Sequence, residues 1–175
     1  IMDGKGRVRL DYDIPSRGLI GFHGECLTLS SGSAIVTHVF DRYDVVQENV
    51  TAIKRNNGVL IANGPGKTTA YSLFNLQPRG KLFVGPQTEV YEGMVIGIHT
   101  RDNDLEVNPI KAKQLTNIRA AGSDENIILS TPIRLTLEYA LEFIEDDELV
   151  EITPKSIRLR KRFLKEHERK KAARG

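Results

Sequence analysis

The first residues to test for chemistry are Gly64, Pro65, Gly66 and Lys67, which two threonines follow. A phosphate-binding P-loop has the pattern G-x-x-x-x-G-K-[ST], and its first glycine opens a turn that directs backbone N–H groups at a phosphate. Counting back from Gly66, Ile61 holds the position of that first glycine, and Pro65 has no N–H to donate. The pattern therefore predicts a turn between two strands and no nucleotide site.

A nearby acidic stretch begins like a calcium-binding loop, because Asp102, Asp104 and Glu106 alternate. Val107 replaces the glycine that such a loop needs next, and Lys113 stands at the twelfth position, where a glutamate belongs. Histidines and cysteine form no metal site either, because they are scattered without the ligand spacing of zinc sites; they are His23, His38, His99, His167 and Cys26. We expect no catalytic residue, cofactor or metal site in this chain.

The composition is that of an ordinary globular protein, with 39% hydrophobic and 27% charged residues. No apolar run approaches the ~20 residues that cross a bilayer, so we expect no membrane-spanning segment. A single cysteine has no disulfide partner within the chain, which favours a reducing, cytoplasmic location. The sequence has no capping signal at its start and leads straight into a strand, so we expect a fragment of a longer protein.

The net charge of +2 conceals a basic end on an acidic body. Residues 155–175 hold ten Lys/Arg and two Glu, whereas the rest of the chain holds fifteen Lys/Arg and twenty-one Asp/Glu. Such an asymmetry indicates an anionic partner, either nucleic acid or an anionic membrane surface. The alternative is a solvated terminal tail.

Residues 110–126 are long for a hairpin loop and have small residues at their tip. Long loops inside compact domains are usually functional or disordered. Cations and short polar side chains together suit contact with a phosphate backbone; here they are Lys111, Lys113, Thr116, Asn117, Arg119 and Ser123. The residues alone leave both interpretations open, contact with a phosphate backbone and simple flexibility.

The first part of the chain is expected to form a strand, a helix and a second strand. Residues 7–14 alternate apolar and polar side chains, which is typical of a half-buried strand. A helix is expected to begin at Ser16 and to end at Gly32, and the β-branched run 34–40 is a second expected strand. This βαβ unit cannot bury both faces of a two-stranded sheet, so other strands must lie upstream or in the rest of the chain.

After about residue 50, short strand-like runs punctuated by Gly, Pro, Asn and Asp predict a β-barrel or sandwich. The runs are residues 58–63, 68–76, 80–85, 88–100, 126–131, 149–153 and 156–164. One helix interrupts them; Thr136 caps it, and its apolar stripe is Leu137, Ala140, Leu141 and Ile144. Residues 165–175 are expected to form a frayed basic helix or a tail.

One stretch, YDIPSRGLIGFHGECLTLSSGSAIVTHVFDRYD, resembles the second half of the fifth domain of elongation factor G and its translational GTPase relatives. The matching residues are Pro15, Gly21, Phe22, Thr28, Ser30, Gly32, Phe40, Asp41 and Tyr43. Cys26 and Ala34 stand where elongation factor G would have Leu and Gly, which argues against elongation factor G itself.

Essentially the whole chain is similar to the C-terminal part of the bacterial TypA/BipA family. The motifs are SRGLIGF, NGVLIANG, RGKLFVG, VYEGMVIGIH, DNDLEVN, KQLTNIRAAGSDE, LEYALEFIEDDELVE and SIRLRKR. The resemblance implies a ribosome-associated, cytoplasmic GTPase that acts in large-subunit assembly and in stress and low-temperature adaptation. GTP and Mg²⁺ would bind an N-terminal domain that this chain lacks, so the resemblance implies no enzyme activity for the chain itself.

The resemblance also implies an α+β fold in two parts. Residues 1–48 would be the second half of a ferredoxin-like fifth domain, and residues 49–175 a mostly β, barrel-like, family-specific domain with one helix. A projecting loop, 110–126, would reach the peptidyl-transferase region and the acceptor end of A-site tRNA, and a basic tail, 155–175, would strengthen attraction to rRNA.

The implied RNA contacts are Lys111, Lys113, Thr116, Asn117, Arg119 and Ser123 in the loop, and Arg158, Arg160, Lys161 and Arg162 in the tail. The expected partners are the ribosome and A-site tRNA, with no membrane partner. Two rival functions are a protein-interaction module whose basic tail only solubilises it, and a self-contained nucleotide hydrolase that uses GPGKTT.

Overall fold

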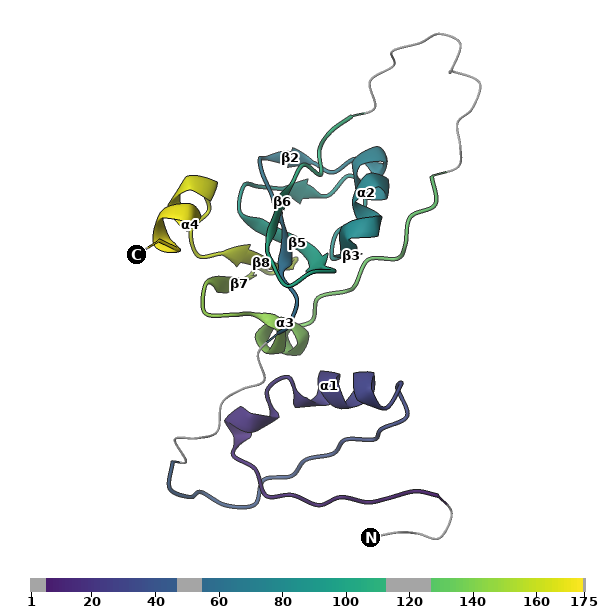
Figure 1. Ribbon diagram of the computed structural model, residues 1–175, viewed down its shortest axis with the longest axis vertical. Coiled ribbons are helices and arrows are strands. Elements are labelled where there is room, and N and C mark those ends of the chain that lie inside the picture. Colours follow the sequence, from purple (N-terminus) through teal and green to yellow (C-terminus); the bar gives the residue numbers. More distant parts are fainter. Residues whose placement is uncertain (1–5, 47–54, 113–126, 175) are drawn as a thin grey trace. The chain divides into compact units, whose positions relative to one another are not determined.

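The computed structural model describes residues 6–46, 55–112 and 127–174. By its internal contacts the chain divides into two compact units, residues 1–54 and 55–175 (Figure 1). The predicted domain boundary at residue 48 lies outside the described residues and stays a prediction.

The first unit contains one helical segment in two pieces. Ser16–Leu19 form a 3₁₀ turn (η1), and Phe22–Leu29 form the helix α1. Gly21 separates the two because its φ of +81° is left-handed and interrupts an α-helix. Gly32 ends the segment as predicted, since it has a φ of +83° and its N–H donates to the carbonyl of Leu27 at 2.7 Å.

The two strands predicted for this unit, residues 7–14 and 34–40, do not form in the structure. Residues 6–46 contain no β-strand, and the alternating apolar side chains are exposed instead of half buried: Val8 by 57%, Leu10 by 66% and Tyr12 by 75%. Val8 forms a single β-bridge, which is shorter than a strand. Of the predicted βαβ unit, the structure therefore contains the helix.

The second unit is a sheet with helices packed against it. Its strands are β1 (Val59–Ala62), β2 (Gly66–Lys67), β3 (Gly80–Leu82), β4 (Glu89–Val90), β5 (Met94–His99), β6 (Leu105–Val107), β7 (Glu148–Ile152) and β8 (Ile157–Lys161). Its helical segments are α2 (Ala70–Leu76), η2 (Gln77–Arg79), α3 (Leu137–Phe143) and α4 (Glu166–Ala172). The class is α+β, as predicted. Of the helices described in either unit, none has both the length and the apolar character needed to cross a bilayer.

The main sheet has the strand order β6-β1-β5-β8-β7, and β3 also pairs with β5. Strand β1 is antiparallel to β5 and parallel to β6, so the sheet is mixed. Strands β2 and β4 form a separate two-stranded sheet. The described strands leave the main sheet open between β6 and β7, so the predicted barrel is not supported. Strand β6 was not predicted, and residues 127–131 form no strand.

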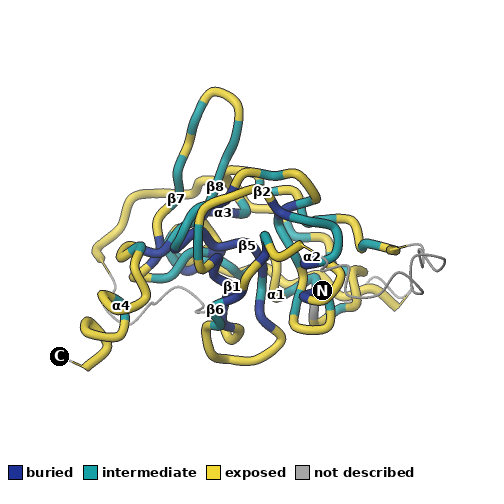
Figure 2. The backbone as a smooth tube through the Cα atoms, turned by 90° about the horizontal axis from the view of Figure 1, so that it is seen from above, coloured by how far each residue is buried: buried dark blue, intermediate teal, exposed yellow. Residues whose placement is uncertain are grey.

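Two apolar cores, one on each face of the sheet, explain why it stays open. Strand β1 is buried along its whole length: Leu60 joins a core that contains Leu73 of α2, whereas Val59 and Ile61 join a core that contains Phe143 of α3. Neighbouring side chains of a strand point to opposite faces, so a continuous apolar run needs cover on both. Figure 2 shows buried residues concentrated in β1 and β5, at the centre of the sheet. Helix α2 covers one apolar face of the sheet and α3 covers the other. The sheet therefore buries both faces without closing into a barrel.

Residues 68–76, predicted as a strand, contain the helix α2 instead. The hydroxyl of Thr69 accepts a hydrogen bond from the N–H of Ser72 at 3.1 Å and so caps the helix. Leu73 and Leu76 are both buried, three residues apart on one helical face. The cap and this spacing outweigh the strand propensity of the neighbouring threonines and aromatics.

The helix predicted after Thr136 is confirmed as α3, with a different buried face. The hydroxyl of Thr136 accepts a hydrogen bond from the N–H of Tyr139 at 3.2 Å. Ala140 and Phe143 are buried, whereas Leu141 is 54% exposed. The predicted stripe is therefore only partly right, because Phe143 takes the place that was given to Leu141.

A buried ion cluster joins the beginning and the end of the second unit. Glu148, at the start of β7, is 3% exposed and accepts hydrogen bonds from the guanidinium of Arg55 at 2.7 and 2.9 Å. Lys161, at the end of β8, is 1% exposed. Its ammonium lies 3.0 Å from Glu148, 2.8 Å from Asp147 and 2.6 Å from Asp104. These five residues link four segments that are far apart in the sequence.

Burial and pairing act in opposite directions on the charges of this cluster. Burial alone would raise the pKa of Glu148, but its hydrogen bonds with Arg55 and the charge of Lys161 lower that pKa below its ordinary value. Burial alone would lower the pKa of Lys161, but hydrogen bonds to Asp104 and Asp147 raise it. Glu148 and Lys161 are therefore both charged at neutral pH, and each depends on the other for compensation.

We expect Glu148→Gln to destabilise the second unit, because Arg55 and Lys161 lose their shared carboxylate while they stay buried. Breaking a buried ion pair by removing one partner costs roughly 3–5 kcal/mol. We expect a loss of that order in the free energy of unfolding, measured by urea titration with far-UV circular dichroism. Glu145→Gln is the matched control, because Glu145 is 37% exposed and lies 3.7 Å from Arg55; its loss should cost under ~1 kcal/mol. Equally small losses in both variants would contradict the assigned role of the cluster.

The buried ion cluster also predicts how stability depends on pH. Folding lowers the pKa of Glu148 below its ordinary 4.5, so its contribution is present above that pH and is lost as the pH falls through the folded pKa. Folding raises the pKa of Lys161 above its ordinary 10.5, so its contribution is complete below that pH and is lost as the pH rises through the folded pKa. Urea titrations should show wild-type stability falling below about pH 4.5, with a weaker fall in Glu148→Gln. Identical acid profiles would count against the assignment.

Candidate RNA-binding surface

The β7–β8 hairpin projects from the rest of the second unit (Figure 2). Its strands pair antiparallel over their whole length, and residues 153–156 form the turn. The N–H of Thr153 donates to the carbonyl of Ser156 at 2.9 Å, and the hydroxyl of Thr153 accepts from the N–H of Ser156 at 3.0 Å. The hairpin is thus a closed, regular arm with Pro154 and Lys155 exposed at its tip.

Two arginines share one face of β8. Side chains alternate along a strand, so Arg158 and Arg160 lie on the face opposite to Leu159 and Lys161. Leu159 belongs to the core beneath α3. On the other face, Arg160 Nε lies 3.0 Å and Arg158 Nε 3.6 Å from the carboxylate of Glu151, and Glu151 is the cross-strand partner of Arg158.

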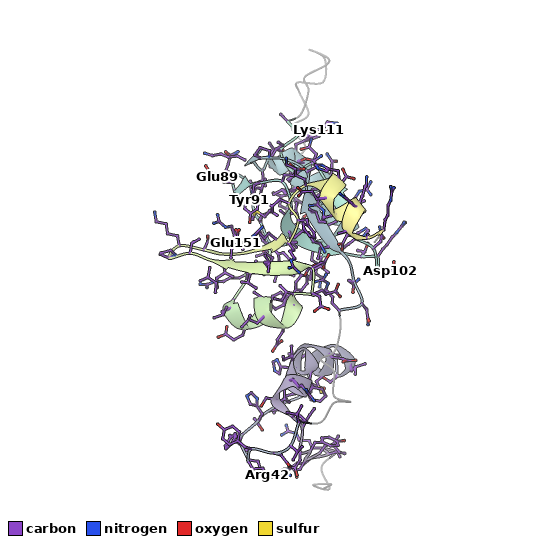
Figure 3. The ribbon with its side chains drawn as sticks, turned by 90° about the vertical axis from the view of Figure 1, so that its left-hand side faces the viewer. Arg42, Glu89, Tyr91, Asp102, Lys111 and Glu151 are labelled. Atoms are coloured by element: carbon purple, nitrogen blue, oxygen red, sulfur yellow. The ribbon has the colours of Figure 1, made fainter. Side chains whose placement is uncertain are left out.

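Tyr91, which lies between β4 and β5, completes this group. Its hydroxyl donates a hydrogen bond to the carboxylate of Glu151, and Figure 3 shows the two residues on the same side of the unit. Burial, together with this hydrogen bond, raises the pKa of Tyr91, so its hydroxyl stays protonated and remains a donor. We call Tyr91, Glu151, Arg158 and Arg160 the arginine face.

The arginine face is positively charged, because one carboxylate serves two guanidinium groups. Within the described residues, the buried Nε atoms of Arg158 and Arg160 make no hydrogen bond, although both lie within ion-pair distance of Glu151. The two side chains are 35% and 26% exposed, respectively. Guanidinium groups suit bidentate contact with phosphate oxygens, and a phosphate would reach the exposed part of each group, not its buried Nε.

Lys161 was predicted to contact RNA, but its position indicates a structural role. Its ammonium is buried among the carboxylates of Asp104, Asp147 and Glu148, so it stabilises the base of the hairpin and has no surface to offer a phosphate. We therefore leave Lys161 out of the proposed interface. Arg162, the next residue, is exposed, and its N–H donates to the carbonyl of Asp147 at 2.7 Å.

Of the predicted loop, residues 110–126, the structure describes only the beginning, residues 110–112. Lys111 is exposed, and its carbonyl accepts a hydrogen bond from the hydroxyl of Thr69 at 2.7 Å. Figure 3 shows Lys111 away from Tyr91 and Glu151, so the structure does not bring it together with the arginine face. The other predicted loop contacts lie outside the described residues; they are Lys113, Thr116, Asn117, Arg119 and Ser123.

The basic C-terminal residues form the helix α4, and two of their cations already have internal partners. Arg169 pairs with Glu106 of β6, and its guanidinium donates to the carbonyl of Phe163 at 2.6 Å. Lys170 pairs with Glu166 one turn earlier. These two cations are therefore less available to an anionic partner than the hairpin arginines.

The GPGK residues do not form a P-loop. Gly66 and Lys67 are strand β2, which pairs with Val90 and Glu89 of β4. A P-loop instead runs from a strand into the N-terminus of a helix. The predicted turn between two strands fits this arrangement, because the turn lies between β1 and β2.

One acidic group has the proximity of metal ligands, since oxygens of Glu145, Asp147 and Glu148 lie within 4.8 Å of one another. Cations of the protein already form ion pairs in this group, because Arg55 and Lys161 both pair with Glu148. The arrangement is therefore an internal ion cluster and does not need a metal ion for charge balance.

Sequence reasoning missed Tyr91 and Glu151. A signal for Glu151 was present, because counting outward from the turn at residues 153–156 places it opposite Arg158 in an antiparallel hairpin. Tyr91 had no such signal, since its contact joins residues 60 positions apart.

Family comparisons agree with a chain made of two parts. The family model described as "TypA/BipA C-terminal domain" matches residues 57–166, which is more than half of the chain. A second model, described as "Elongation factor G C-terminus", matches residues 1–54.

Similar proteins include three named "Large ribosomal subunit assembly factor BipA". The identities are 60% over 173 residues in Escherichia coli strain K12, 55% over 172 in Haemophilus influenzae and 61% over 165 in Buchnera aphidicola. These alignments cover 99%, 98% and 94% of this chain but 28%, 28% and 27% of the relatives, so the chain spans little more than a quarter of their length. The chain belongs to the TypA/BipA family, and residues 57–166 are that family's C-terminal domain.

Proposed function

We propose that this chain is the ribosome-docking end of a TypA/BipA-type translational GTPase that acts in large ribosomal subunit assembly and in stress or cold adaptation. In this proposal the chain binds large-subunit rRNA and the acceptor end of A-site tRNA in the cytoplasm. GTP and Mg²⁺ bind to the N-terminal domain of the parent protein, and the contribution of this chain is binding.

The arginine face is the observation that supports RNA docking most directly. Its two arginines and Glu151 lie on a projecting β-hairpin, and the two arginines share that single carboxylate. Phosphate contacts by such groups set the position of a protein on RNA without reading its sequence. The names of the relatives, which call them large-subunit assembly factors, support the ribosome as the source of that RNA.

The proposed interface has two parts. One is the hairpin, with Arg158 and Arg160 on the arginine face and Arg162 next to it. The other is the loop of residues 110–126, for which we propose contacts by Lys111, Lys113, Thr116, Asn117, Arg119 and Ser123. We retain the proposed division into a fifth-domain half, residues 1–48, and a family-specific domain, residues 49–175.

A protein-interaction module is the alternative function. It is favoured by exposed apolar side chains in the first unit, where Ile35 is 86%, Val39 90% and Phe40 71% exposed. Such a module would bind ribosomal proteins, and its capture of partners would survive ribonuclease. Capture through RNA would be lost on the same treatment.

We expect the full 175-residue chain to sediment with purified large ribosomal subunits in a salt-dependent manner. Each neutralised phosphate should add roughly 0.7–0.9 to the slope of log affinity against log salt. Arg158→Ala/Arg160→Ala should weaken sedimentation and lower this slope, because it removes two cations from the arginine face. Lys113→Ala/Arg119→Ala tests the loop in the same way.

Arg134→Ala is the matched control, because Arg134 is exposed in the same unit but lies outside the hairpin and the loop. It should leave both the affinity and the slope near wild type. Wild-type affinity and slope in both double variants, each with a normal urea titration, would refute RNA docking through these residues.

A further inference from the structure

A pocket of about 270 Å³ lies between the β7–β8 hairpin and the segment that runs from β3 to β5. The hairpin contributes Ser156, Ile157 and Arg158, and the other wall includes Phe83, Glu89 and Met94. Pockets for drug-sized ligands measure roughly 300–1,000 Å³. This pocket is smaller, so its size suits one small group and not an extended ligand.

The pocket is apolar inside and charged outside. Met94 is 4% exposed, so this part of the lining is deep. Phe83 and Ile157 add further apolar walls of intermediate exposure. Glu89 is exposed and Arg158 is 35% exposed, which puts a carboxylate and a guanidinium at the mouth.

Arg158 is common to the pocket and to the arginine face. Its guanidinium has one carboxylate neighbour, Glu151, 3.6 Å from Nε, and Arg160 shares that carboxylate. A group that enters the pocket beside Arg158 therefore meets a cation whose charge one shared carboxylate only partly balances. This favours a ligand that joins a flat apolar body to an anion, as a nucleotide does.

We propose that this pocket receives one unstacked base of the RNA bound by the hairpin, an inference that rests on the proposed function. The faces of the base pack between Phe83 and Ile157, as unstacked RNA bases do against apolar and aromatic side chains. The guanidinium of Arg158 binds the phosphate of the same strand. Glu89 accepts a hydrogen bond from an amino group on the base edge.

The charges at the mouth argue for a base over a protein side chain. An apolar side chain from a protein partner offers no phosphate to Arg158 and no hydrogen-bond donor to Glu89. Both groups gain partners when a nucleotide occupies the pocket. A protein side chain as the occupant is an outcome that the experiment below detects.

The test measures binding of the full chain to fluorescein-labelled single-stranded RNA by fluorescence anisotropy, with an abasic RNA of equal length as the second probe. The abasic strand keeps every phosphate and lacks the bases. We expect wild type to bind the base-containing strand about fivefold or more tightly, which is the low end for one stacked base. Ile157→Trp, which fills the pocket, should bind both strands equally and keep the salt dependence.

Ile152→Trp is the matched control, because Ile152 is the cross-strand partner of Ile157, is 64% exposed and does not line the pocket. It should keep the wild-type preference. Equal binding of both strands by wild type, with normal salt dependence, overturns the base pocket and leaves the proposed function standing. The same result with RNA, beside capture of ribosomal proteins that Ile157→Trp loses, assigns the pocket to a protein side chain. No salt-dependent binding to either strand overturns both proposals. The wild-type comparison decides the case even if Ile157→Trp fails to fold.

Discussion

The ion pair between Glu148 and Lys161 is the constraint on which the second unit depends. The pair closes the base of the β7–β8 hairpin, where the two residues are cross-strand partners. Arg55 links Glu148 to the start of the unit. Asp104 links Lys161 to the end of the β5–β6 connection. A strand that slips by one residue turns every side chain to the other face. Because Lys161 must face inward to meet its carboxylates, Arg160 and Arg158 are directed to the opposite face. Internal pairing of one cation therefore sets the position of the others.

The central strands of the second unit were predictable because their sequence is apolar and bounded by turn residues. VLIA and MVIGI form β1 and β5 as expected, and the hairpin follows from two strand-like runs around Pro154. The same strand-like runs led to the prediction of a β-barrel or sandwich, whereas the described strands form an open sheet with helices on both faces. Both faces of β1 are buried, and only the positions of α2 and α3 reveal that helices, not a closed barrel, cover them. Helix α2 is seven residues long, so its sequence shows too few helical turns to be told from a strand by periodicity alone.

The sequence predicted that the candidate site carries positive charge, but it did not predict which cations lie at the surface. The count of cations after residue 155 points to an anionic partner, but a count cannot separate Lys161, which is buried and paired, from Arg158, which lies next to an open pocket. That separation comes from strand alternation combined with carboxylates supplied by distant segments. In the first unit, alternation predicted a strand for residues 7–14 and β-branched content predicted one for residues 34–40, but neither pattern measures burial, and most of the apolar side chains of both segments are exposed in the structure.

The central claim is that the β7–β8 hairpin contacts RNA on the large ribosomal subunit. The most direct measurement replaces Lys155, at the exposed tip, with the photo-crosslinking amino acid p-benzoylphenylalanine and identifies what it joins after irradiation with purified large subunits. The same replacement of Glu138, exposed on α3, is the reference. We predict crosslinks to rRNA from position 155 and not from position 138. Crosslinks from position 155 to ribosomal proteins alone, with the chain bound to the subunit, would contradict the claim.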